Sequence, residues 1–113
     1  MLRKLLIFIL TIFVGLMINN PSSVLAVDSN KGAKIFSVQC AGCHPNGNNI
    51  IRRGKNLKLK ALKRNKVDSL DAIISLVTNG KNNMSAYSDR LTSAEIEAVS
   101  EYVLEQAQNN WRK

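Results

Sequence analysis

The residues best suited to chemistry are two cysteines and the single histidine of this 113-residue chain, which stand together as Cys40-Ala41-Gly42-Cys43-His44. Cys-x-x-Cys-His is the attachment signature of c-type haem, in which both thiols add to haem vinyl groups and the histidine ligates the iron. One helical turn separates positions i and i+3, so both sulfurs can reach the same edge of the ring. The spacing predicts a covalent haem held by Cys40 and Cys43, with His44 as an axial ligand.

Three other interpretations of this motif fit the chain less well. A thioredoxin-like redox pair is expected beside a βαβ unit, and no segment alternates in the way a strand does. A structural zinc site needs four ligands, and the chain has only two cysteines and one histidine. A simple disulfide would leave His44 without a role.

A second axial ligand can be sought by elimination. His44 is the only histidine, which excludes bis-histidine ligation within one chain. Met84 is the only methionine outside the N-terminal leader described below, and it follows shortly after Gly80 in a polar stretch. A loop at this point can return across the ring, so Met84 is the predicted sixth ligand. The alternative is a water-bound or lysine-bound iron, with Met84 only filling space.

The first 26 residues have the order of a secretory signal peptide. Two basic residues precede an uninterrupted apolar run over residues 5–18, and a small-residue site ends at Ala26. A membrane anchor is the alternative, but this run is shorter than the ~20 apolar residues that span a bilayer. We therefore expect residues 1–26 to be a cleaved signal peptide and residues 27–113 to form one small domain.

The length of the mature chain limits the number of domains and the size of the hydrophobic core. Removing the leader leaves 87 of the 113 residues, which is enough for one domain and excludes separate cofactor and substrate lobes. A domain of this size buries only roughly 60–65% of the surface that its unfolded chain exposes. We therefore expect the haem to complete the core.

Apolar residues recur with a helical period in three segments, which predicts an all-α domain. The first predicted helix covers residues 29–39, with Ala33, Phe36 and Val38 turned inward. Gly32 leaves room on this helix for another helix to approach. The first and last helices are therefore expected to pack against each other.

The other predicted elements have recognisable start and stop signals. The second helix is expected to begin at Asp68 as its N-cap and to end at Gly80. The third is expected over residues 92–108, opening with a capping box. A short helical turn is expected within residues 57–63, and residues 47–54 are expected to be loop.

The positive charge is concentrated in one segment. Without the leader, 14 lysines and arginines stand against eight acidic residues. Eight of the bases lie in residues 52–66 with no acidic residue among them, and the remainder of the domain is slightly acidic. This basic segment is either a solvated face or a surface that steers the protein toward an acidic partner. We expect no nucleic-acid binding by an exported haem protein.

Three asparagines and two aromatic residues could also contribute to the predicted haem site. Asn48, Asn49 and Asn82 can either hydrogen-bond haem propionates or cap backbone groups. Tyr87 and Trp111 are expected to be structural and not redox-active.

The order of these motifs resembles the cytochrome c6 family over almost the entire mature chain. Beyond the haem motif, the resemblance rests on Asn79-Gly80-Lys81, on Met84-Ser85-Ala86-Tyr87, and on Tyr102-Val103 with Trp111. It implies a small cytochrome c-type fold, with three to four helices wrapped around one covalently attached haem. By the same resemblance Cys40 and Cys43 attach the haem, and His44 and Met84 are its axial ligands. Family members usually have proline where this chain has Ser85.

The resemblance also implies a function. Such a protein is a one-electron carrier of the photosynthetic thylakoid lumen, monomeric and without enzymatic activity, that moves electrons from cytochrome f of the cytochrome b6f complex to photosystem I. The near alternative is a respiratory periplasmic cytochrome that serves a cytochrome c oxidase. A haem enzyme or gas sensor with a labile Met84 is disfavoured, because no second histidine is present as a distal base.

Overall fold

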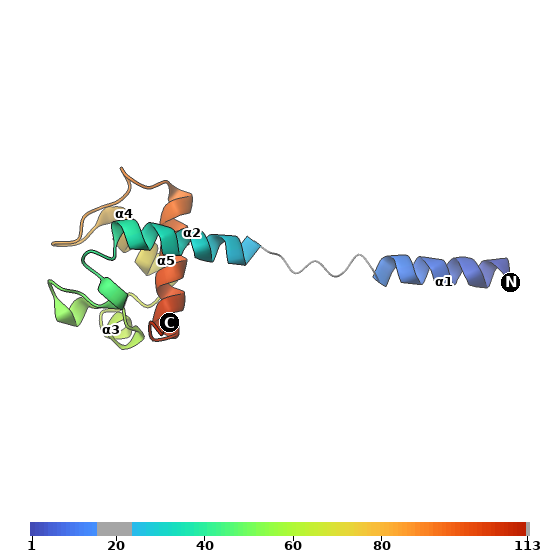
Figure 1. The fold of residues 1–113 in the computed structure, drawn as a ribbon, viewed down its shortest axis with the longest axis horizontal. Coiled ribbons are helices and arrows are strands. Elements are labelled where there is room, and N and C mark those ends of the chain that lie inside the picture. The colour runs from blue at the N-terminus through green and yellow to red at the C-terminus, as the bar shows by residue number, and fades with distance from the viewer. Residues whose placement is uncertain (16–23, 113) are drawn as a thin grey trace.

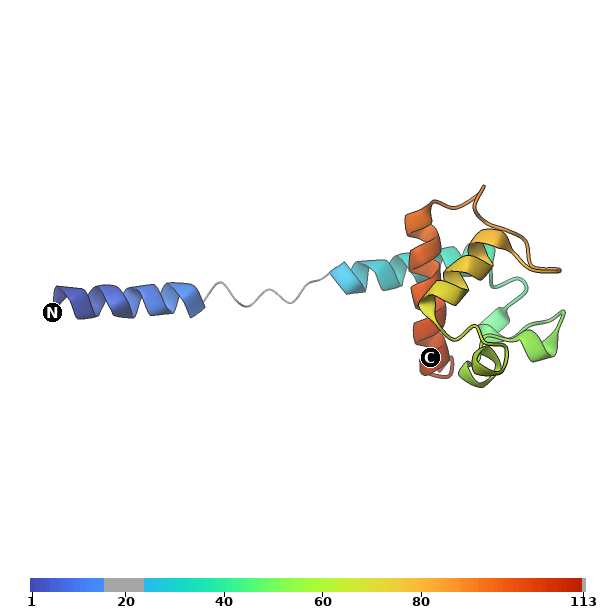
Figure 2. The same ribbon diagram turned by 180° about the vertical axis from the view of Figure 1, so that it is seen from behind.

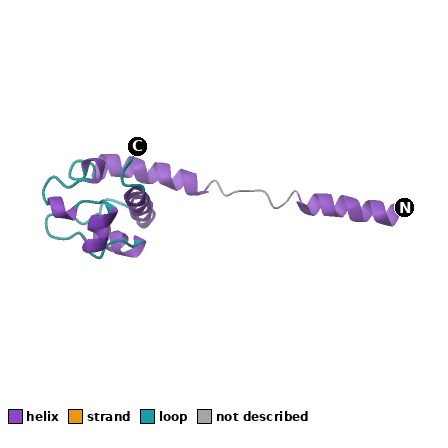
Figure 3. Cartoon of the chain, turned by 90° about the horizontal axis from the view of Figure 1, so that it is seen from below, coloured by secondary structure: helices purple, strands orange, loops and turns teal. Residues whose placement is uncertain are grey.

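The computed structural model describes residues 1–15 and 24–112 (Figure 1). Its α-helices in these ranges are α1 Leu2–Gly15, α2 Val24–Gln39, α3 Leu59–Arg64, α4 Leu70–Asn79 and α5 Ser93–Gln108. Two 3-10 turns, Pro45–Gly47 and Arg53–Lys55, lie between α2 and α3. Apart from an isolated bridge between Lys81 and Met84, the described residues form helices and loops without strands (Figure 3). The all-α expectation is confirmed.

Helix α1 is 14 residues long and covers residues 5–15 of the expected apolar run. None of the helices in the described ranges combines the length and the hydrophobicity needed to cross a membrane. The end of the expected apolar run and the polar residues after it, residues 16–23, lie outside the described residues. Cleavage after Ala26 remains a prediction.

Helix α2 starts five residues earlier than the sequence pattern indicates, at Val24 instead of Ser29. No proline or glycine lies between these two positions, so nothing in the sequence prevents an earlier start. The expected burial of Phe36 is confirmed, whereas the expectation for Val38 is wrong, since its side chain is 75% exposed. Two residues correspond to about 200° around a helix, so the side of α2 that buries Phe36 turns Val38 to solvent.

The close crossing of α2 and α5 is the main packing contact of the fold (Figures 1 and 2). It depends on Gly32, where an added Cβ would lie 2.8 Å from Tyr102 Cβ and closer still to the carbonyl oxygen of Ala98. Next to this point, the rings of Phe36 and Tyr102 pack with their centroids 5.5 Å apart. The expected partnership of the first and last helices is confirmed.

The caps of the last two helices show one confirmed and one wrong prediction. Thr92 and Glu95 form the expected capping box, with the Thr92 N–H donating to Glu95 Oε2 at 2.8 Å and the Glu95 N–H to Thr92 Oγ1 at 3.2 Å. The N-cap of α4 is Ser69 and not Asp68, because Ser69 Oγ accepts from the Ala72 N–H at 3.2 Å. Both residues can serve as N-caps, and periodicity does not distinguish adjacent positions.

Trp111 connects the C-terminal end of the chain to the loop after α2. Its indole N–H donates to the carbonyl oxygen of Leu57 at 2.9 Å, and its ring packs on Phe36 with a centroid distance of 5.1 Å. Gly47, whose φ is +75°, lies against the face of the indole, where a Cβ would collide with the ring. The structural role expected for Trp111 is confirmed.

Replacing Gly32 with alanine should destabilise the haem-loaded protein by about 1–3 kcal/mol, because the collision involves the backbone of α5 and forces the two helices apart. Unfolding in guanidinium, followed by circular dichroism, measures this change. Gly54→Ala is the matched control, since a Cβ there meets nothing closer than Arg64 Nη2 at 3.7 Å. Equal stability of the two variants would show that the helix crossing tolerates a side chain.

Candidate haem-binding site

The Cys-x-x-Cys-His segment forms a tight turn that continues from the end of α2. The N–H groups of Cys40 and Ala41 both donate to the carbonyl oxygen of Phe36 at 2.9 Å. The His44 N–H in turn donates to the carbonyl oxygen of Cys40 at 2.9 Å. Both cysteines are free, with Cys40 partly buried and Cys43 exposed. The turn therefore presents two unpaired thiols, and the disulfide interpretation is not supported.

The ring of His44 is oriented by a backbone contact. Its Nδ1 lies 2.9 Å from the carbonyl oxygen of Asn48. A carbonyl can only accept, so Nδ1 carries the proton and Nε2 keeps its lone pair. Burial lowers the pKa of His44, with the hydrogen bond to Asn48 acting in the opposite direction. At neutral pH the imidazole is therefore uncharged, which is the form that ligates a metal.

The Cys40 side chain faces the interior of the site. Burial raises the pKa of the Cys40 thiol to about 11, and the nearby Cys43 adds to the shift. Burial of Tyr87 raises the pKa of its own hydroxyl, the thiolate form of Cys40 would add to that shift, and the charge of Arg90 acts in the opposite direction. Both groups are protonated at neutral pH in the haem-free polypeptide.

Met84 lies in a loop that doubles back directly after α4. Gly80 ends the helix with a φ of 68°, and Lys81 and Met84 then exchange two backbone hydrogen bonds of 3.0 Å. A Cβ on Gly80 would lie 2.6 Å from both the Met84 carbonyl oxygen and the Ala86 nitrogen. Only glycine allows the chain to pass so close to itself here. The expected helix end at Gly80 is confirmed.

One cavity brings the four predicted site residues together. Cys40, Cys43, His44 and Met84 all line it, although they come from two loops that are far apart in the sequence. It holds about 1420 Å³ of space free of protein atoms, its open mouth included. Its apolar lining comes from α2, α3, α4 and α5 and includes Phe36, Leu62, Ile73, Leu76, Val77, Val99 and Val103.

The lining and the donor set suit a c-type haem. Two thiols on one turn can attach the ring edge, an imidazole and a thioether can ligate iron, and the apolar lining can cover a porphyrin. In the part of the chain that the structure describes, no three His, Cys, Asp or Glu side chains gather into a metal-binding cluster. The zinc interpretation therefore finds no support there.

Asn49 is a backbone cap, a role that the sequence left open. Its Oδ1 accepts from the N–H groups of Ile51 at 2.9 Å and Arg52 at 2.7 Å. Its Nδ2 donates to the carbonyl oxygen of Lys55 at 3.1 Å. The side chain thereby shapes the loop at the cavity mouth. Asn82 occupies a left-handed backbone position, with a φ of 54°, which asparagine tolerates better than most residues.

Comparison with known proteins shows which family the chain belongs to. A family model described as cytochrome C oxidase, cbb3-type, subunit III matches residues 28–103. A protein named cytochrome c6-like from Nostoc sp. strain PCC 7120 is 54% identical, over 98% of this chain and 100% of the relative. The chain belongs to the cytochrome c6 family.

Solved structures of cytochrome c6 variants have the same fold. Cytochrome c6B from Synechococcus sp. WH8102 is 52% identical with a TM-score of 0.72, over 75% of this chain and 97% of that one. Cytochrome c6C from Synechococcus sp. PCC 7002 is 61% identical with a TM-score of 0.68, over 70% of this chain and 96% of that one. The small cytochrome c-type fold is confirmed.

Membership of the cytochrome c6 family defines the cofactor and the general role. The cofactor is one covalently bound c-type haem with its iron, and the role is electron transport by a c-type cytochrome. The resemblance to cytochrome c6 seen in the sequence is thereby confirmed.

Replacing both Cys40 and Cys43 with alanine should abolish haem attachment and most of the helical circular dichroism signal. The physical reason is that α2, α4 and α5 share one small core whose residues also line the cavity, and without the cofactor that core would lose the apolar surface that it needs for stability. Gly42→Ala is the control, because a Cβ there meets no atom within 4 Å and both thiols remain. Holo-like helix content in the haem-free double variant would show that the core is self-sufficient.

Proposed function

We propose that this cytochrome c6 family member carries single electrons from cytochrome f of the cytochrome b6f complex to photosystem I. In this proposal Cys40 and Cys43 attach the haem, and His44 and Met84 are the axial ligands. The observation that supports it best is the convergence of these four side chains on one apolar cavity. A respiratory carrier to a cytochrome c oxidase is the second candidate, and the oxidase description of the matching family model favours it.

The chain's residues favour electron transfer over ligand chemistry. When bound, the haem supplies a one-electron iron couple. His44 is held neutral with Nε2 free, and the Met84 loop is fixed at Gly80 and by the Lys81–Met84 hydrogen bonds. With both side chains as ligands no coordination position would be open to an external ligand, and a thioether ligand would raise the reduction potential. The apolar lining of the cavity would exclude water from the faces of a bound haem.

Export places the carrier in the thylakoid lumen or the periplasm. Residues 1–26 act as the signal peptide and are removed after Ala26, so the working protein is residues 27–113. Support comes from helix α1, in which two basic residues near the start are followed by an apolar run. The mature protein is a monomer without stable membrane insertion.

The basic segment at residues 52–66 guides an acidic partner to the haem. All eight of its lysines and arginines are exposed. None of them lies in an ion pair within the described residues, where the ion pair found joins Asp89 and Arg90 at 4.0 Å. Arg52 and Lys55 line the cavity itself. The segment is therefore available to a partner and lies beside the site.

Replacing Met84 with leucine should open the sixth coordination position while nearly preserving side-chain volume. We expect a lower reduction potential and carbon monoxide binding to the ferrous form, measured by redox titration and visible spectroscopy. The neighbouring change Ser85→Ala should alter neither. If Met84→Leu keeps the wild-type potential and spectrum, the ligand is another group.

Transient absorbance of photosystem I after a flash tests the proposed role. The protein should accelerate re-reduction of the oxidised reaction centre, and the rate should fall as salt rises, because exposed charges are screened over ~10 Å at 0.1 M. In Arg53→Glu/Lys58→Glu the rate at low salt should fall on the order of two- to tenfold, without a change in reduction potential.

Lys31→Glu/Lys34→Glu is the matched control, with the same change in net charge on α2 and away from the basic segment. Its rate should stay closer to wild type. Equal rates for the two double variants would make the basic segment only a solvated face. No acceleration by the wild-type protein would remove the photosystem I assignment, and turnover with a cytochrome c oxidase would then support the respiratory candidate.

A further inference from the structure

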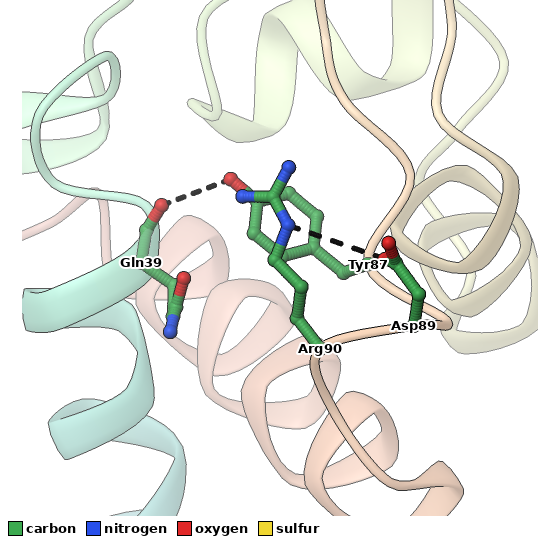
Figure 4. Close-up of polar contacts among 4 residues, drawn as sticks. All are labelled: Gln39, Tyr87, Asp89 and Arg90. Carbon is green, nitrogen blue, oxygen red and sulfur yellow. Dashed lines mark hydrogen bonds and ion pairs between the residues drawn. The ribbon is translucent and has the colours of Figure 1, made fainter.

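A single side-chain hydroxyl joins the two loops of the site. Tyr87 Oη donates to the carbonyl oxygen of Gln39 at 3.0 Å, across 48 positions of the sequence (Figure 4). Gln39 is the last residue of α2 and directly precedes Cys40. Carbonyls at the end of a helix lack an intrahelical partner, so this one is available to accept.

Tyr87 is itself held from several sides. Its N–H donates to the carbonyl oxygen of Val77 in α4 at 2.9 Å. Its own carbonyl oxygen accepts from the N–H groups of Arg90 at 3.0 Å and Leu91 at 2.9 Å. The Arg90 guanidinium lies over the phenol ring, 4.9 Å from its centroid, and contacts Asp89 (Figure 4). The hydroxyl is therefore presented to Gln39 by a fixed ring.

The loop that carries Met84 is thus fastened at both ends. Upstream, the close passage at Gly80 and the Lys81–Met84 hydrogen bonds fix it to the end of α4. Downstream, Tyr87 fixes it to α4 through its backbone and to α2 through its hydroxyl. Displacing Met84 outward pulls on the downstream end, and the Tyr87–Gln39 bond resists that movement.

We propose that Tyr87 is a positioning residue, whose hydrogen bond to Gln39 holds the Met84 loop against the haem-attachment segment and so keeps external ligands from the iron. This inference rests on the proposed role of Met84 as an axial ligand. Without the hydroxyl, the loop leaves its position at a lower cost, and a small external base competes more easily with the thioether.

Imidazole titration of the ferric protein, followed in the Soret band, tests this role. Tyr87→Phe removes one oxygen and keeps the ring with its Arg90 contact. Its imidazole affinity should exceed that of wild type about three- to tenfold, the factor expected for one net hydrogen bond. Tyr102→Phe is the matched control, because its ring packs against both Phe36 and Trp111 and its hydroxyl makes no hydrogen bond in the described structure. Its affinity should equal that of wild type.

A double-mutant cycle with Met84→Leu separates positioning from general loosening. Met84→Leu alone should bind imidazole far more tightly than wild type, and adding Tyr87→Phe should then change nothing, because no thioether remains to be held. Wild-type affinity in Tyr87→Phe combined with tight binding in Met84→Leu would overturn the positioning role and leave the ligand assignment intact. Wild-type affinity in Met84→Leu would overturn both. Equal gains in the presence and absence of Met84 would also overturn positioning.

Discussion

The small core shared by α2, α4 and α5 also forms the wall of the cavity, so packing and cofactor binding use the same residues. Phe36 of α2, Ile73 and Val77 of α4, and Val99 and Val103 of α5 all line that space. A chain of this length has no second core to compensate. A haem bound there would therefore complete the folded core, and the segments that line the cavity would hold both the haem and the fold together.

Close backbone approaches connect the cavity walls, and each depends on a glycine. Gly32 allows α5 to cross α2 closely, and Gly47 allows the loop after α2 to lie on the ring of Trp111. Gly80 allows the backbone at the end of α4 to lie close to the backbone of the Met84 loop. At each of these positions a side chain would displace backbone or a buried ring. The geometry of the site therefore depends on these three close contacts around the cavity as well as on the residues that line it.

Much of this could be predicted from the sequence, because the decisive signals are local. The Cys-x-x-Cys-His spacing, the capping box at Thr92 and the Gly80 helix end each act within a few residues. The wrong predictions, Val38 as buried and Asp68 as N-cap, come from patterns that fix a position only to within one or two residues. The capping role of Asn49 and the Tyr87–Gln39 bond require knowing which loops meet, and no local pattern contains that information.

The charge distribution completes the connection between fold and function. The exposed bases of residues 52–66 follow directly after Ile50 and Ile51, which are 66% and 56% exposed, and the Ile50 N–H donates to the carbonyl oxygen of Cys43. Four of the eight acidic residues lie on α5, which forms another wall of the cavity. This separation of charge gives the molecule an electric dipole moment, so the field of a charged partner orients it. Under the proposed function, an acidic partner surface would turn the edge that carries Cys43 toward itself, and the exposed isoleucines beside that edge would supply a small apolar contact. Because surface charges add more to the association rate than to affinity, such a contact can form quickly and still release, as repeated electron transfer requires.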